Sequence, residues 1–230
     1  MTDEKSKKII GGFDMTLKVG IIGATGMAGS AITEEAVDRG FEVTGFVRNA
    51  EKAKEVLPDT VKLVVKDAFD IQRVDVQDLD VLVDAYATHN MSHAYKHVDL
   101  AARLIEFAKE ADKPRLFFIL GAGSLETENG HRFVEKLEKV PNSESFIEIP
   151  RQQLKEYQLL TNTNHVDWVA VSPSATFKPG DATDYVLGQN DLLTNPEGKS
   201  EITAGTMAKV INDEIEHPAH HNERFTAVDK

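Results

Sequence analysis

The chain has 230 residues, 41% of them hydrophobic, which is enough to bury one sizeable core. Its formal net charge of −12 and the lack of a locally basic patch argue against nucleic acid, whose phosphates it would repel. The chain has no cysteine, so disulfides and thiolate chemistry are excluded, and neither an apolar stretch of membrane-spanning length nor a signal peptide is visible. We therefore expect a cytoplasmic protein.

Residues 1–14 are largely polar and precede Met15, which itself resembles a natural start. We interpret them as a polar leader that is either loosely ordered or upstream of a second start. No linker, repeat or low-complexity block divides residues 15–230, so we expect a single domain there.

The first recognisable unit is an apolar run over 17–22 that stops at three glycines spaced three residues apart. They are Gly23, Gly26 and Gly29. Apolar residues then recur every four positions up to Gly40, as in a helix that ends at a glycine, and 41–47 has the pattern of a second strand. Strand, glycine turn, helix and strand predict a site for a dinucleotide pyrophosphate. In such a site the glycines permit a tight turn, approach of phosphate to backbone, and close helix packing.

Strands and helices continue to alternate along the chain. Further strands are expected at 61–65, 81–87, 115–120, 166–171 and 224–227, and further helices at 92–110, 150–161 and 205–216. This order predicts an α/β fold with a doubly wound parallel sheet. The segment after Pro173 is rich in Gly, Pro, Asp and Asn, and we expect it to form a small C-terminal region that covers the substrate.

The end of the second strand indicates which dinucleotide binds. In NAD enzymes an acidic residue about 20 residues beyond the glycines holds the ribose 2′-OH, whereas arginine accommodates a 2′-phosphate. Arg48 occupies this position, Lys52 and Lys54 lie nearby, and 46–49 contains no carboxylate. The sequence therefore favours NADP(H) over NAD(H), with an exposed loop arginine as the alternative interpretation.

Other cofactor contacts are predicted from position at the ends of later strands. They are Asp67 and Ala68 after the third strand, Ala85, Tyr86 and Ala87 at the end of the fourth, and Pro173 after the sixth. Asp67 is expected at the adenine edge and Tyr86 beside the second half of the cofactor. A loop-starting aspartate and a half-buried core aromatic are equally good interpretations of these two residues.

Candidate catalytic residues are sought where the fifth strand ends. Ser124, in Gly-Ala-Gly-Ser, is placed to hydrogen-bond a substrate carbonyl. Dehydrogenases acting on alcohols commonly use a tyrosine with a lysine four residues later, and no tyrosine of this chain has one. The nearest surrogate is Arg151 with Lys155, for which a solvated helix face is the competing interpretation. The catalytic candidates are thus Ser124, Lys155 and Tyr86.

Three C-terminal histidines superficially resemble a metal cluster. His217, His220 and His221 lie in a polar stretch that contains proline. There is no cysteine, and no pair of histidines at four-residue spacing forms a ligand face on a helix, so we expect these histidines to be solvent-exposed and predict no metal site.

A combination of segments carries a family resemblance. The segments are 23–29, Val47-Arg48-Asn49, Asp67-Ala68-Phe69, 121–125, Ser172-Pro173-Ser174-Ala175 with Phe177 and Pro179-Gly180, and Asp213-Glu214-Ile215-Glu216. From Met15 onward the chain resembles the atypical short-chain dehydrogenases, and more narrowly the bacterial NADH-flavin reductases related to NmrA-like proteins and to biliverdin reductase B.

This resemblance implies a Rossmann-type NAD(P)H-binding fold with flavin or quinone-like reductase activity. The family contacts it implies are Gly23, Thr25, Gly26 and Met27 to pyrophosphate, and Arg48 to a 2′-phosphate. The family name specifies NADH, whereas Arg48 favours NADPH, and we give the local charge more weight. At 180–185 the chain lacks an arginine and a glycine of the expected family pattern, so no substrate contact is carried over there.

Three functions are compatible with these residues. The first is NADPH-dependent hydride transfer to a flavin, quinone or similar conjugated acceptor, which needs no strong general acid because the ring spreads the charge. The second is a non-catalytic NmrA-like sensor of NADP(H). The third and weakest is a nucleotide-sugar epimerase, because such enzymes usually need the tyrosine and lysine. We expect a small-molecule partner, neither nucleic acid nor a membrane, and leave homo-oligomerisation open.

Overall fold

The computed structural model describes residues 9–10, 13–14, 16–109, 111, 113–128 and 130–230. Of the expected leader it describes only β1 (Ile9–Ile10) and β2 (Phe13–Asp14), which pair antiparallel. The prediction of a leader at 1–14 therefore falls largely outside the described residues.

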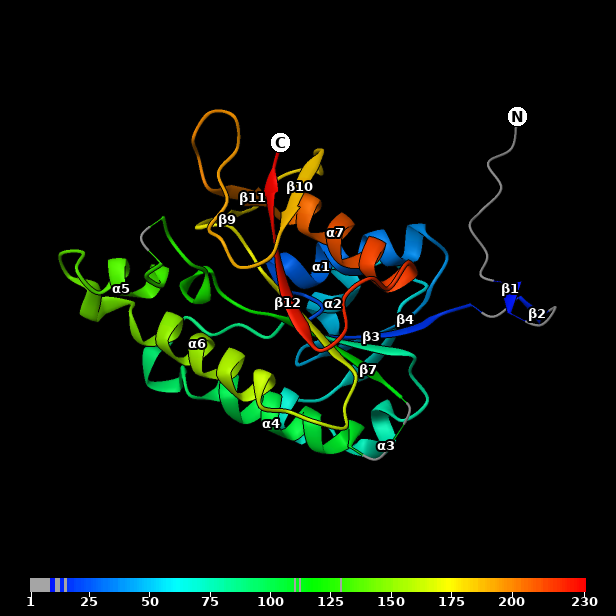
Figure 1. Ribbon diagram of the computed structural model, residues 1–230. Coiled ribbons are helices and arrows are strands. Elements are labelled where there is room, and N and C mark those ends of the chain that lie inside the picture. Colours follow the sequence, from blue (N-terminus) through cyan, green and yellow to red (C-terminus); the bar gives the residue numbers. More distant parts are fainter. Residues whose placement is uncertain (1–8, 11–12, 15, 110, 112, 129) are drawn as a thin grey trace.

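An eight-stranded sheet forms the centre of the protein (Figure 1). Its strands lie in the order β10-β12-β8-β7-β6-β3-β4-β5, and every neighbouring pair is parallel except β10 with β12. Their bounds are β3 Lys18–Ile22, β4 Glu42–Val47, β5 Lys62–Val65, β6 Val81–Asp84, β7 Arg115–Ile119, β8 Trp168–Ser172, β10 Tyr185–Gly188 and β12 Glu223–Asp229. The chain runs outward from β3 to β5 and then returns to β6. The predicted doubly wound sheet is confirmed, and such sheets bind ligands at the carboxyl ends beside this reversal.

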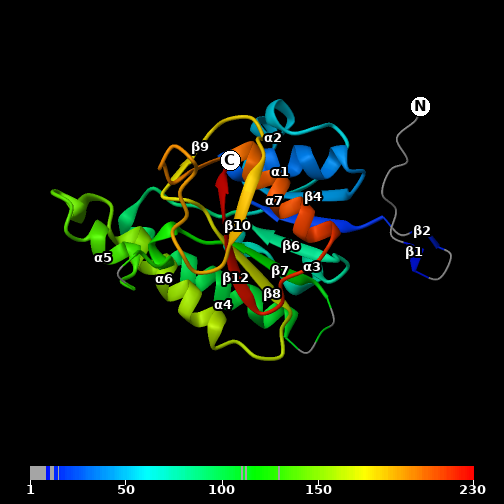
Figure 2. The same ribbon diagram turned by 45° about the horizontal axis from the view of Figure 1, so that its top comes forward.

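Helices cover both faces of the sheet, as the two views of Figures 1 and 2 show. One face packs against α1 (Met27–Asp38), α2 (Ala50–Val56) and α7 (Ala204–Glu216), and the other against α4 (Lys96–Ala108) and α6 (Glu148–Thr161). Shorter elements are α3 (Arg73–Val76), α5 (Phe133–Leu137), and the single turns η1 (Ala68–Asp70), η2 (Met91–His93), η3 (Ala122–Ser124) and η4 (Ser143–Ser145). Within the described part of the chain, no helix is long and apolar enough to cross a membrane.

The core consists of two apolar layers, one on each face of the sheet. Strand β7 contributes to both, because Phe117 packs on the side of α1 and α7 while its neighbour Phe118 packs on the side of α4 and α6. Successive residues of a strand point to opposite faces, so a strand covered by helices on both faces must be apolar throughout. This is why β7 has the continuous apolar pattern from which it was predicted.

The expected strands and the long helices are present, with small differences in their bounds. Strand β6 ends at Asp84 rather than at residue 87, because the Asp84 carboxylate accepts the Tyr86 N–H at 2.9 Å and turns the chain there. Helix α1 ends as predicted. Gly40 has a φ of +81°, and the Gly40 and Phe41 N–H groups donate back to the carbonyls of Val37 and Ala36.

The segment after Pro173 is more regular than its composition suggests. It contains β9 (Thr176–Lys178) and β11 (Glu201–Thr203), which pair parallel, and the edge strand β10. It also reaches the carboxyl end of β7, since the Asn190 carbonyl accepts the Glu126 N–H at 2.7 Å. The predicted terminal strand at 224–227 is the core of β12 and joins the central sheet between β8 and β10.

Candidate functional site

The glycine turn lies between β3 and α1, and glycine is needed at its three positions for different reasons. A Cβ on Gly23, whose φ is +74°, would lie 2.7 Å from the Ala85 carbonyl oxygen, and a Cβ on Gly29 would lie 2.2 Å from the Gly23 carbonyl oxygen. Packing against the protein itself thus explains these two. Gly26 is exposed, and its Cβ would meet only the Gly23 oxygen, at 3.2 Å. The space in front of Gly26 is open, as the approach of a phosphate to backbone requires.

The N-terminus of α1 is free to bind an anion at this place. Gly26 is the N-cap and has no side chain to cap the helix, and no acidic residue lies in the first turn. The first N–H groups of a helix lack an intrahelical acceptor and carry its positive dipole end. Thr25 is half-buried and Met27 is exposed, so both flank this open end. The geometry fits the pyrophosphate contacts predicted for 23–29.

Arg48 follows β4 on the same carboxyl edge of the sheet. It is exposed, and within the described residues it forms no ion pair, whereas Lys54 is paired with Glu51 at 3.1 Å. Asn49 caps α2 by accepting the Lys52 N–H at 3.0 Å, which holds the start of that helix beside Arg48. A cation without a carboxylate partner at this position fits a ribose 2′-phosphate.

Tyr86 follows β6 and lies near residues that follow two other strands, β4 and β5. Its half-buried ring meets Phe69 and His97 edge-on, at centroid distances of 6.0 Å and 5.3 Å. Burial raises the pKa of its phenol; the Asp67 carboxylate raises that pKa further and the Arg48 guanidinium opposes it. The predicted contacts Arg48, Asp67 and Tyr86 therefore lie near one another, although Asp67 also caps η1 through the Phe69 N–H.

The remaining predicted cofactor residues differ in exposure. Ala68 is half-buried in η1, Ala85 is half-buried against Gly23, Ala87 is exposed, and Pro173 is buried directly after β8. Their contacts with a dinucleotide stay predictions.

Three ionisable side chains are buried behind Tyr86, and none of them was predicted from the sequence. They are Asp84 at the end of β6, His97 on α4 and Glu156 on α6. Burial raises the pKa of Asp84 to about 7, raises that of Glu156 well above its ordinary value, and lowers that of His97 to about 4. His97 Nδ1 lies 3.8 Å from Glu156 Oε2, so burial favours the neutral forms of this pair. The only sequence signal was a polar Asp84 closing an apolar run.

Ser124 lies where it was predicted, beyond β7, but it is not alone. Its hydroxyl is buried, 3.2 Å from the Ser172 hydroxyl, and Arg224 Nη1 makes long contacts of 3.5 Å and 3.4 Å to the two hydroxyls. Arg132 Nη1 donates to the Ser124 carbonyl at 2.5 Å. Ser124 thus belongs to a polar cluster built from η3, β8 and β12, with Arg132 at the start of α5.

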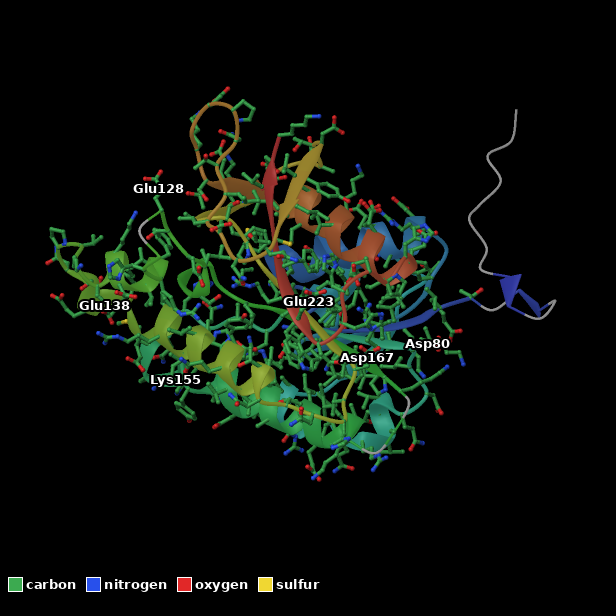
Figure 3. The ribbon with its side chains drawn as sticks, in the orientation of Figure 1. Asp80, Glu128, Glu138, Lys155, Asp167 and Glu223 are labelled. Carbon is green, nitrogen blue, oxygen red and sulfur yellow. The ribbon has the colours of Figure 1, made fainter. Side chains whose placement is uncertain are left out.

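Lys155, a predicted catalytic residue, lies on the outer face of α6, away from Ser124, and its catalytic role stays a prediction that this position does not support. The inner face carries Gln153, whose Oε1 would be 2.1 Å from a Cβ on Gly121. Residues of a helix are about 100° apart, so Lys155 points away from Gln153. Lys155 is exposed (Figure 3), and Arg151 on the same outer face pairs with Glu138 at 2.8 Å. Helix α6 thus borders the end of β7 as expected, but with the face opposite to Lys155.

The C-terminal histidines are only partly solvated, which corrects the expectation for one of them. His217 and His221 are exposed, but His220 is half-buried, stacks on Phe225 with a centroid distance of 4.4 Å and lies 2.8 Å from Glu214. Glu214 also pairs with the buried Arg115 at 2.9 Å. His220 therefore helps to attach the end of α7 to the sheet.

Comparisons with known proteins agree with this geometry. A family model described as NAD(P)H-binding matches residues 23–218. The uncharacterized protein YwnB of Bacillus subtilis is 36% identical over 216 residues, which are 92% of this chain and 98% of YwnB. A putative NADH-flavin reductase from Streptococcus pneumoniae has a crystal structure with a TM-score of 0.83 and 30% identity, covering 93% of this chain and 100% of that one. A putative epimerase from Bacteroides thetaiotaomicron has a TM-score of 0.82 and 32% identity, covering 94% and 98%.

Proposed function

This chain belongs to the NAD(P)H-binding family, and we propose that it is an NADPH-dependent reductase of a flavin, quinone or similar conjugated acceptor. The fold is of the Rossmann type, and the coarser function, an NAD(P)H-binding oxidoreductase, follows from the family and from the neighbours' names. The identity of the acceptor and the preference for NADPH are our proposal.

One observation carries the proposed chemistry, the side chains that α6 turns toward the end of β7. They are Gln153 and Tyr157, which have the four-residue spacing of the tyrosine and lysine of alcohol dehydrogenases, whereas Lys155 lies outside. Tyr157 thus stands beside the Arg224 guanidinium and not beside a lysine, so an alkoxide would lack the Tyr–Lys pair that usually protonates it. A conjugated ring spreads the negative charge that hydride delivers, so it is the acceptor class that suits these residues. The same observation disfavours an epimerase.

The roles of the chain's own residues follow from their positions. Backbone N–H groups at Gly26 and Met27 bind the pyrophosphate, and Arg48 holds the 2′-phosphate. Tyr86 lies between the cofactor end and the acceptor end of the carboxyl edge, and its ring packs beside the reactive half of the cofactor. Ser124 orients a carbonyl of the acceptor. NADPH, when bound, supplies the hydride.

The test is steady-state oxidation of NADPH with a panel of flavins and quinones, compared with the same panel and NADH. We expect turnover with at least one conjugated acceptor and a higher kcat/KM with NADPH. Tight NADPH binding without turnover on any acceptor would contradict the reductase and support the sensor of NADP(H). Equal or better use of NADH would contradict the role of Arg48 and leave the reductase standing.

A further inference from the structure

Arg224 is a buried cation without a carboxylate. The residue is only 4% exposed. Within the described residues, no aspartate or glutamate oxygen lies within 4.0 Å of its guanidinium, whereas the buried Arg115 is paired with Glu214 at 2.9 Å. Its acceptors are neutral: the hydroxyls of Ser124 and Ser172, and the Asn190 amide oxygen at 2.8 Å from Nη2. The Nε atom has no partner. A buried charge normally has a counter-charge, because desolvation otherwise costs several kcal/mol.

A second guanidinium, that of Arg132, approaches the same place. The ring of Tyr157 lies 4.7 Å from the Arg224 guanidinium carbon and 5.9 Å from that of Arg132. Burial lowers the pKa of Arg224, and the charge of Arg132 lowers it further, while the Tyr157 hydroxyl and, to a smaller extent, the Glu126 carboxylate beyond ion-pair distance oppose this. An aromatic face offsets part of the cost of such a pair, but it supplies no net negative charge.

The pair lies at the acceptor end of the site. Arg132 Nη1 donates to the carbonyl of Ser124, which follows the carboxyl end of β7, and Arg224 contacts the Ser124 hydroxyl. Arg132 is half-buried and Asn190 is exposed, so this is the side of the pair that faces solvent and from which a ligand would approach. An anionic oxygen would replace the Asn190 amide oxygen on Arg224 and bridge to Arg132, since guanidinium groups match phosphate and carboxylate oxygens in geometry.

We propose that Arg132 and Arg224 bind an anionic group, a phosphate or a carboxylate, carried by the acceptor that this site reduces. That the ligand is the acceptor rests on the proposed function. That the ligand carries an anionic group rests on the arginine pair alone. It makes the substrate a conjugated ring with an acidic side chain rather than a neutral ring.

The experiment compares flavins that share one ring system and differ in the group at the end of the N10 chain. FMN against riboflavin tests a phosphate, and N10-carboxymethylflavin against lumiflavin tests a carboxylate. Dissociation constants are measured by flavin fluorescence at saturating NADP⁺, and kcat/KM is measured with NADPH. The variants are Arg132→Met, which alters a half-buried residue, and Arg224→Lys, which keeps the charge but loses the planar fork. Arg73→Met, at an exposed position on α3, is the control.

We expect the wild type to bind one anionic flavin at least tenfold more tightly than its neutral counterpart. Arg132→Met and Arg224→Lys should each reduce that ratio at least fivefold, and Arg73→Met should leave it unchanged. The flavin pair that shows the preference identifies phosphate or carboxylate as the anion. Should the Arg224 variant fail to fold, Arg132→Met decides.

Two results would overturn the anion site. One is equal binding of charged and neutral flavins by the wild type. The other is a loss of NADPH affinity in Arg132→Met as large as the loss of flavin affinity, because the pair would then serve the cofactor. Preferential binding of an anionic flavin without NADPH oxidation would instead keep the anion site and refute the reductase.

Discussion

The two ends of the carboxyl edge of the sheet are formed by different chemical groups. We call them the proposed cofactor end, at 23–29, and the proposed acceptor end, around Ser124. At the cofactor end, seven consecutive residues, 23–29, shape the turn, and the expected ligands are backbone N–H groups of α1. At the acceptor end, side chains meet from four elements that are distant in the chain, η3, α6, β8 and β12. A backbone-built end tolerates few substitutions but can serve many relatives unchanged. A side-chain-built end can alter its ligand by single substitutions.

The largest effects are expected in the glycine turn, where one substitution should abolish binding and another should lower stability. Gly26→Val should fold and lose dinucleotide affinity more than about 100-fold, because its branched side chain would occupy the open space before the helix N-terminus. Gly29→Val should instead lower the melting temperature, since its Cβ would lie 2.2 Å from the Gly23 carbonyl oxygen. Calorimetric titration with NADPH and thermal melts of both variants check this. A folded Gly26→Val with unchanged affinity would refute the pyrophosphate site.

This difference in construction decided what the sequence could predict. The glycine turn, its flanking strands and the doubly wound parallel sheet are local patterns or follow from them, and they were predicted correctly. Arg224 lies 100 residues from Ser124, and nothing local to either residue indicates that they meet. Only the fold brings them together.

Helix α6 shows a second limit of prediction from sequence, which is to decide which face of a polar helix is buried. Arg151 and Lys155 share one spacing, and Gln152 and Glu156 share the same spacing on a face about 100° away. Both faces are polar in sequence, so periodicity could not show that Glu156 is 2% exposed while Lys155 faces solvent. Buried polar residues resemble a solvated surface until the packing around them is known.

The second prediction concerns the buried acids between the two ends. Burial raises the pKa of Asp84 to about 7 in the folded protein, well above its value of 3.8 in an unfolded chain. The folded state therefore holds the proton that the unfolded state releases, and stability is lost as pH rises from about 4 through 7. For Asp84 alone this corresponds to a loss of about 2–3 kcal/mol in the free energy of unfolding between pH 5 and 7.5. Glu156 acts in the same direction, whereas His97, whose pKa burial lowers to about 4, acts in the opposite one because the unfolded state binds its proton.

Asp84→Asn should flatten this dependence, because its side chain stays neutral at every pH in the window. Urea unfolding of the wild type and the variant at pH 5, 6, 7 and 7.5 measures the difference. Asp59→Asn, at an exposed position, is the matched control and should retain the slope of the wild type. An equal slope in Asp84→Asn would contradict the assignment.

The third prediction tests a side chain at the otherwise backbone-built end. Arg48→Ala should remove most of the preference for NADPH over NADH, because a charged hydrogen bond to phosphate contributes about 1.5–3 kcal/mol, or about 10- to 100-fold in affinity. Binding of NADH should stay within about twofold of the wild type. Calorimetry with both cofactors on both proteins provides the four constants, and an unchanged ratio would exclude Arg48 as the residue that holds the 2′-phosphate.

The smallest effect is expected for the hydroxyl at the acceptor end. Ser124→Ala removes one contact to an acceptor carbonyl but leaves Arg224 and the Ser172 hydroxyl in place, 3.4 Å apart. We therefore expect kcat/KM to fall by less than about 100-fold, the lower end of what a general acid contributes. Lys155→Met, on the outer face of α6, should leave kcat/KM within about twofold of the wild type. A larger loss in Ser124→Ala, with a pH profile that changes shape, would mean that the hydroxyl transfers a proton in the rate-determining step. A large loss in Lys155→Met would mean that α6 turns its outer face toward the substrate during turnover.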